Sequence, residues 1–239
     1  MLKLISACTR GRAALAMKKQ IAASLAAFCA AICSSSCFAA GAPDLFGITS
    51  GMDVATASKQ ALAQLHPTKF INMKFSTGQS AGFQAITDGH GGRTEGFRVD
   101  TPISGVVTFL SRAVDFGSDI GPQTDDLLRD LEAKYGRYSS RETIGTGLVV
   151  LVWRYSKDWQ IQGSAPKECA AITLKTDISG TLPLYLPPEK ARNCDPFMRV
   201  SIQSNADTKA VKSYSIAIFD ERRMFTETTP AAPTTVATH

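Results

Sequence analysis

Two segments of the chain carry apolar residues at the spacing of an amphipathic helix. The first covers residues 53–67. It begins at Asp53, a residue type that caps helices, and it ends at Pro67, which cannot continue one. Its apolar face consists of Val54, Ala57, Ala61 and Leu65. This pattern predicts a helix that lies on the protein core with one side.

The second helical segment covers residues 124–136. Thr124 is the expected cap, and Asp125 and Asp126 follow it at the positive end of the helix dipole. Gly136 is the expected end of the helix. The apolar face consists of Leu128, Leu131 and Tyr135.

Most of the remaining chain has the pattern of short β-strands. These segments are rich in β-branched and aromatic residues and are separated by Gly, Pro, Asn or Asp. No strand alternates regularly with a helix, which argues against a parallel, doubly wound sheet. We therefore predict an α+β fold, with two helices packed on a mainly antiparallel sheet. The expected strands are residues 70–75, 83–87, 96–100, 104–110, 148–156, 170–176, 197–204 and 211–219.

The first 39 residues have the organisation of a secretory signal peptide. Two lysines follow Met17, an apolar run extends from residue 21 to 32, and small residues lead to Ala39. Met17 is a possible true start, and cleavage is expected after Ala39. The apolar run is too short for a membrane anchor, and no apolar residue precedes Cys37 as a lipoprotein cleavage site requires. We expect a periplasmic or secreted protein without a stable membrane anchor.

Removing the signal peptide changes the charge of the chain. The full sequence has 26 basic and 21 acidic residues, and residues 1–39 hold five basic residues and no acidic one. The mature chain thus has 21 of each. Because a protein without net positive charge or a basic patch attracts a phosphate backbone weakly, nucleic acid is not an expected partner.

Two of the six cysteines remain after cleavage, Cys169 and Cys194. In an oxidising compartment an isolated pair predicts one disulfide bond. The alternative is a metal site, but no His or Cys stands near either residue at a suitable spacing. We expect neither a metal nor a cofactor.

The segment Gly78–Gly82, GQSAG, fits the G-x-S-x-G pattern of many serine hydrolases. That pattern requires a strand before the serine and a helix directly after it. Here a second strand follows Ser80, and His90 is the only plausible base. A serine hydrolase using Ser80 and His90 is therefore the alternative function, and we favour a protein without catalytic activity.

Residues 88–96, DGHGGRTEG, form the segment with the highest glycine density. They carry Asp88, His90, Arg93 and Glu95. Such a segment is typical of a hairpin loop, and its functional interpretation is a flexible contact loop for a partner.

Residues 46–62, FGITSGMDVATASKQAL, resemble a segment near the start of many bacterial secreted proteins. They are also similar to the helix start of SmpA/OmlA (BamE-type) envelope lipoproteins and related β-lactamase-inhibitor-like folds. DDLLRDLEAKYG, followed by LVVLVWRY, resembles a later segment of the same secreted group. This chain is longer than the lipoproteins and has no lipidation site.

The resemblance implies that each helix leads its own sheet, which gives two similar halves. The first half is expected at residues 43–117 and the second, with the disulfide, at residues 118–225. Residues 226–239 are Thr, Pro and Ala without apolar periodicity and are expected to be disordered.

These features favour a non-catalytic binding or accessory module of the bacterial envelope. We expect an exposed sheet face or loop to engage an envelope protein or another macromolecule. The sequence does not indicate an oligomeric state.

Overall fold

The computed structural model describes residues 41–102, 104–163 and 193–228. In this part of the chain, helices pack against a nine-stranded antiparallel sheet, which confirms the predicted α+β class. The strand order is β3-β4-β5-β6-β11-β10-β8-β7, with β9 paired to β8. The strands are β3 (Lys69–Lys74), β4 (Ser80–Asp88), β5 (Thr94–Asp100), β6 (Phe109–Asp115), β7 (Ser140–Ile144), β8 (Leu148–Tyr155), β9 (Ile161–Gln162), β10 (Phe197–Ser204) and β11 (Val211–Phe219).

Helix α2 (Val54–Leu65) forms where the first apolar stripe predicts it. The Asp53 carboxylate accepts hydrogen bonds from the backbone N–H groups of Ala55 and Thr56, at 3.0 and 3.1 Å. These bonds satisfy two donors that have no partner inside the helix. The helix ends before His66, whose φ of 44° is left-handed, and Pro67 follows.

Helix α3 (Thr124–Tyr135) matches the second stripe, but its expected cap is wrong. Gln123 occupies the cap position and makes no side-chain cap bond. Thr124 is instead the first helical residue, and its hydroxyl donates to the Lys209 carbonyl at 2.7 Å. This contact ties the start of α3 to the loop before β11. The helix ends at Gly136 as predicted, with a φ of 79°.

Two further elements were not expected. A two-stranded hairpin, β1 (Asp44–Leu45) and β2 (Ile48–Thr49), precedes α2. A third helix, α6 (Glu221–Thr228), follows β11 and extends into the segment expected to form the tail. The expected strand at residues 170–176 lies outside the described residues, the strand expected at residues 104–110 forms at Phe109–Asp115 instead, and β7 and β9 form outside the expected strands.

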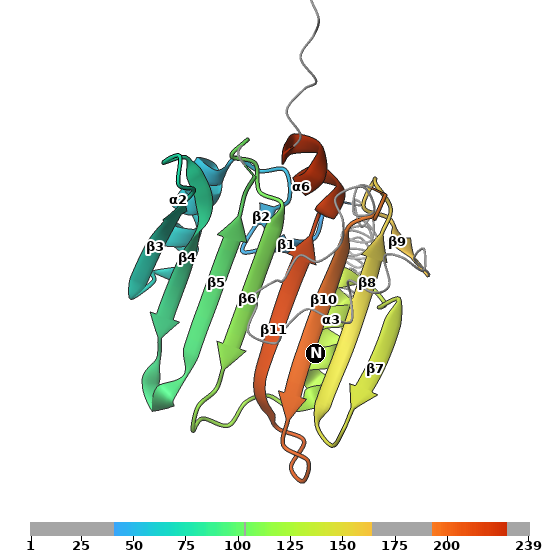
Figure 1. Ribbon diagram of the computed structural model, residues 1–239. Helices are drawn as coiled ribbons and strands as arrows, with labels where there is room; N and C mark the ends of the chain where they lie inside the picture. The colour runs from blue at the N-terminus through green and yellow to red at the C-terminus, as the bar shows by residue number, and fades with distance from the viewer. Residues whose placement is uncertain (1–40, 103, 164–192, 229–239) are drawn as a thin grey trace, which may run out of the picture. The chain divides into compact units, whose positions relative to one another are not determined.

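Figure 1 shows α2 and α3 on the same face of the sheet, α2 behind β3 and β4 and α3 behind β10 and β8. The largest buried cluster lies between the helices and this face, which we call the helix face. Alternate residues of each strand contribute to it, as the period of two in a strand requires. Its members include Ala57, Ala61, Phe83, Phe97, Leu110, Leu128, Leu131, Leu151, Trp153, Met198, Val200, Ile216 and Ile218.

The opposite face of the sheet, the second face, carries a smaller buried cluster. The rings of Phe197 and Phe219 stack with centroids 4.5 Å apart, and Phe109 lies 4.9 Å from Phe219. Phe109 and Phe219 are direct partners in the β6–β11 register. Because β6 and β11 pair, the four strands after α2 and the strands after α3 form one sheet.

Candidate functional site

The structure does not bring Ser80 and His90 together. Ser80 is the exposed first residue of β4, and the segment of His90 follows the last residue of that strand. Strand β4 spans nine residues at about 3.3 Å each, so its ends lie roughly 25 Å apart. Ser80 Oγ accepts a hydrogen bond from the Gly82 N–H at 3.3 Å, and β4 itself follows the serine. The helix of a nucleophile elbow is missing at this position.

Asp88 and Glu95 of the expected contact loop contact different parts of the sheet. The Thr68 hydroxyl donates to Asp88 at 3.0 Å, on the side of β3. Glu95 turns to the helix face, where Arg112 Nε donates to it at 2.7 Å. Arg93 lies 3.9 Å from Glu95. The backbone of His90 belongs to a short 3-10 turn between β4 and β5.

This loop is held against the connection between β6 and α3. Ser118 donates to the Gly91 carbonyl twice, from its backbone N–H at 3.0 Å and from its hydroxyl at 2.7 Å. Gly91 has a φ of 68°, and a Cβ atom there would overlap the carboxylate of Asp119. Glycine is therefore required for both the conformation and the close approach. The contacts favour an ordered hairpin loop over a mobile contact loop.

A hollow of about 360 Å³ lies on the second face, in the middle of the sheet. Its floor is one row of small residues in four adjacent strands: Gly96 in β5, Ala113 in β6, Ser215 in β11 and Ser201 in β10. We call this hollow the trough and the four residues its floor. Larger side chains stand on both sides of the trough: Gln84 and Ile86 on β4, Gln203 on β10 and Leu148 on β8.

The floor of the trough has free hydrogen-bonding capacity. Ser201 is 6% exposed, and its hydroxyl has no hydrogen-bond partner among the residues that the structure describes. The hydroxyls of Ser213 and Ser215 also have no hydrogen-bond partner among the described residues. A serine hydroxyl can donate one hydrogen bond and accept two. No charged side chain belongs to the floor, and the carboxylate of Asp115 lines the trough beside it, so the site suits a group that donates hydrogen bonds and carries no negative charge.

A second cavity, of about 320 Å³, lies on the helix face between α3, β1 and strands β6 and β11. We call it the helix-side cavity. Most of its wall is apolar, and polar groups converge on it from three elements. Its lining is Asp44, Leu45, Phe46, Arg112, Leu127, Asp130, Leu131, Lys134, Tyr135, Tyr214 and Ile216.

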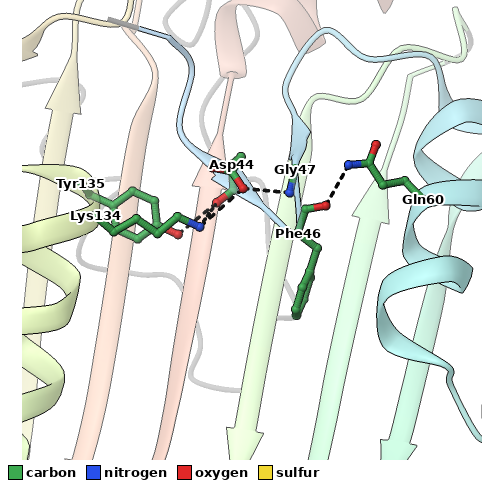
Figure 2. A network of polar contacts seen from close by, with 6 residues as sticks. All are labelled: Asp44, Phe46, Gly47, Gln60, Lys134 and Tyr135. Atoms are coloured by element: carbon green, nitrogen blue, oxygen red, sulfur yellow. Dashed lines mark hydrogen bonds and ion pairs between the residues drawn. The ribbon is translucent and has the colours of Figure 1, made fainter. Parts of the chain in front are cut away.

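The β1–β2 hairpin forms one side of this cavity and is held by both helices (Figure 2). From α3, Tyr135 and Lys134 donate to the Asp44 carbonyl at 3.0 and 3.2 Å. From α2, Gln60 donates to the Phe46 carbonyl at 2.9 Å. Burial raises the pKa of Tyr135, with the Asp44 charge adding to the effect, so the phenol stays a donor at neutral pH. The hairpin thus has a fixed position between the two helices.

Sequence reasoning missed both hollows. In β11 the small residues Ser213, Ser215 and Ala217 alternate with large ones, which is a visible signal for a flat face. The floor, however, depends on the register of four strands, and no pattern within one strand gives that register. The helix-side cavity was missed because Arg112 is a single charged residue in a short strand and belongs to no recognisable sequence motif.

No cluster of three or more His, Cys, Asp or Glu within the described ranges could hold a metal ion. Cys194 is 1% exposed and interacts with another group. Cys169 lies outside the described residues, so the pairing of the two cysteines stays a prediction. Among the described residues, no helix is long and apolar enough to cross a membrane.

Comparison of the chain with protein-family models, with curated proteins and with solved structures finds no match.

Proposed function

We propose that this protein is a non-catalytic binding module of the bacterial envelope that engages a protein partner through the trough. The observation that carries the proposal is the floor of the trough, where four small residues align across β5, β6, β11 and β10. Glycine inside a strand weakens the strand, and it often occurs where another backbone approaches closely. Gly96 stands in this row, at the side of the trough next to β4.

The chemistry of the trough favours a polypeptide segment as the partner. The free hydroxyls of Ser201, Ser213 and Ser215 can pair with the N–H and C=O groups of a peptide. The amide side chains of Gln84 and Gln203, at the two sides, offer both donors and acceptors. The floor carries no charge, and Asp115 at its side disfavours a negatively charged ligand.

The envelope location rests on the sequence. The signal peptide expected at residues 1–39 lies outside the described residues, and we propose its removal near Ala39 and release into the periplasm or the medium. The mature chain then carries equal numbers of basic and acidic residues, which is compatible with a protein partner and unfavourable for nucleic acid.

We also infer that the module consists of two similar halves, residues 43–117 and 118–225. Each helix is preceded by an isolated β-bridge to a residue near the start of the last strand of its set, three residues before β6 in one case and directly before β11 in the other. These bridges are Asp53 with Val106 and Gln123 with Ala210.

The hydrogen bonds at the two bridges also correspond. Val54 donates to the Gly105 carbonyl at 2.9 Å, and Thr124 donates to the Lys209 carbonyl at 3.1 Å. Val107 donates to Met52 at 2.8 Å, and Val211 to Pro122 at 2.9 Å. Matching bonds at matching places support a duplicated unit, with the trough crossing the line where the two sets of strands meet.

The experiment that tests the binding function fills the trough. Ala113 is exposed and belongs to the floor, so Ala113→Arg places a long side chain in the hollow without disturbing the core. Ala63→Arg is the matched control, because Ala63 is an exposed residue of α2. The tagged mature protein and both variants are cross-linked in the envelope of a Gram-negative host, and the attached proteins are identified by mass spectrometry.

We expect a discrete partner with the wild type and with Ala63→Arg, and its loss with Ala113→Arg. Capture of the same partner by all three proteins would contradict the role of the trough.

No observation favours the alternative serine hydrolase, because the segment of His90 lies at the other end of β4 from Ser80. We expect a fluorophosphonate probe to leave the purified protein unlabelled, and stoichiometric labelling that Ser80→Ala abolishes would contradict the binding function.

A further inference from the structure

The helix-side cavity contains an arginine at an unusual place. Arg112 stands in the middle of β6, on the face that buries Leu110 and Val114, which are 0% and 1% exposed. A charge among core residues carries a desolvation cost, and an aliphatic residue would fill the same place without that cost. The position of Arg112 therefore suggests a role beyond packing.

Neighbouring groups hold the Arg112 guanidinium in one orientation. Its Nε donates to Glu95 at 2.7 Å. Its Cζ lies 4.9 Å from the ring centre of Phe46 and 5.7 Å from that of Tyr214, so the guanidinium contacts two aromatic rings. The side chain is 25% exposed. A guanidinium fixed in this way loses little freedom when it binds a ligand.

The two terminal nitrogens of Arg112 remain available. Neither of them has a hydrogen-bond partner among the described residues, and Arg112 lines the cavity. Two parallel N–H groups of a guanidinium match the two oxygens of a carboxylate. The ligand group that fits this end of the cavity is therefore a carboxylate.

The rest of the cavity suits an apolar body. Its volume of about 320 Å³ is at the lower end of the range for ligand pockets, and apolar residues form most of the wall. These residues are Leu45, Phe46, Leu127, Leu131 and Ile216.

The charges around the cavity favour a ligand with a single negative charge. Glu95 already compensates much of the Arg112 charge, and Asp44 pairs with Lys134 at 3.4 Å. Asp130 also lines the cavity and repels a second negative charge.

We propose that the helix-side cavity binds a small monocarboxylate with an apolar body, and that the carboxylate pairs with the terminal nitrogens of Arg112. The cavity lies on the other face of the sheet from the floor of the trough. Tyr214 lines both hollows, whereas Arg112 lines only the cavity, so this proposal does not rest on the proposed protein-binding function.

The test compares 3-phenylpropanoate with 3-phenylpropanamide, which has nearly the same shape and no charge. Binding of each probe to the purified mature protein is measured by NMR titration, and the shifted resonances are assigned. We expect the carboxylate to bind at least about tenfold more tightly than the amide. The shifted resonances should belong to residues that line only this cavity, including Leu127, Leu131 and Ile216.

Arg112→Gln should lower the affinity for the carboxylate by at least about tenfold and leave the affinity for the amide unchanged. Arg98→Gln is the matched control, because Arg98 also pairs with a carboxylate, Asp100 at 2.7 Å, but on the second face. Arg112→Lys keeps the charge and removes the two parallel donors, so an intermediate affinity is expected, and it provides a second variant if Arg112→Gln unfolds.

Equal affinities for the carboxylate and the amide would overturn the proposal. So would an equal loss in Arg112→Gln and Arg98→Gln, or no binding of the carboxylate at millimolar concentration.

Discussion

Glu221 illustrates how strongly one buried residue can couple this fold to pH. It is 2% exposed, and its Oε2 has no hydrogen-bond partner among the described residues. Burial raises the pKa of its carboxyl from 4.5 to about 7. Since the folded protein binds this proton more tightly than the unfolded chain does, the stabilisation is complete below pH 4.5 and is lost as the pH rises towards 7.

We therefore expect the contribution of Glu221 to make the protein less stable at pH 8 than at pH 5, by at most about 3 kcal/mol. Glu221→Gln removes the ionisation and should flatten this dependence while raising stability at pH 8. Urea unfolding at both pH values measures the effect. Glu132→Gln, at an exposed position of α3, is the control. The same pH dependence in both variants would show that Glu221 is not the titrating group.

At the scale of single residues, the sequence predicts the role of a side chain where that role depends only on neighbouring residues in the chain. Asp53 caps α2 as expected because capping needs only the next three residues. Thr124 has an equally suitable side chain, yet its hydroxyl bonds to Lys209, far along the chain. Arg112 acquires its position from Glu95, Phe46 and Tyr214, which lie in three other segments.

At the scale of elements, the turns before β6 and β11 each contain a residue with a left-handed backbone conformation, a glycine in the first turn and a lysine in the second. Gly105 has a φ of 77° and Lys209 a φ of 59°. Glycine adopts this left-handed conformation without strain, whereas a side chain makes it unfavourable by about 1–2 kcal/mol. Lys209 therefore adopts a conformation that is unfavourable for its residue type, whereas Gly105 adopts it without strain.

Lys209→Gly should stabilise the protein by about 0.5–1 kcal/mol, because the relief of strain exceeds the added freedom of the unfolded chain. Gly105→Ala should destabilise it by about 1–2 kcal/mol for the converse reason. Thermal unfolding measures both changes. Lys157→Gly serves as the control, since Lys157 is an exposed turn residue without a positive φ and glycine brings no relief there. If Lys209→Gly and Lys157→Gly lower stability equally, the two turns are not equivalent.

The sequence predicts a helix or strand where the element is buried on one side or on both sides, because burial leaves a pattern of apolar residues. The continuous apolar run of β8 and the two helical stripes were found for this reason. Strand β7 was missed because all five of its residues are exposed, so that it has no apolar pattern. The strands β1 and β2 have two residues each, which is too short for any periodicity.

At the scale of the whole molecule, the pairing of β6 with β11 decides the architecture, and it joins residues about a hundred positions apart. No local signal specifies such a pair. The antiparallel class was predictable from turn spacing, but the strand order, the trough and the helix-side cavity all depend on this long-range register. The two similar halves are an expectation from the family resemblance, and they stay a proposal.

The predicted disulfide between Cys169 and Cys194 also belongs to this scale, because it would close a loop of 25 residues between two parts of the chain. In an oxidising compartment, the only two cysteines left after signal cleavage should pair. Closing this loop should stabilise the fold by about 3.5 kcal/mol in the chain-entropy model.

Thiol titration of unfolded, periplasm-derived protein should detect no free thiol before reduction and two afterwards. The variant with Cys169→Ser and Cys194→Ser should melt at a lower temperature, because its unfolded chain is no longer restrained. The same variant should melt like the reduced wild type, which separates loss of the bond from loss of the sulfur atoms. Two free thiols before reduction would exclude the bond, and an unchanged melting temperature in the variant would exclude its stabilising role.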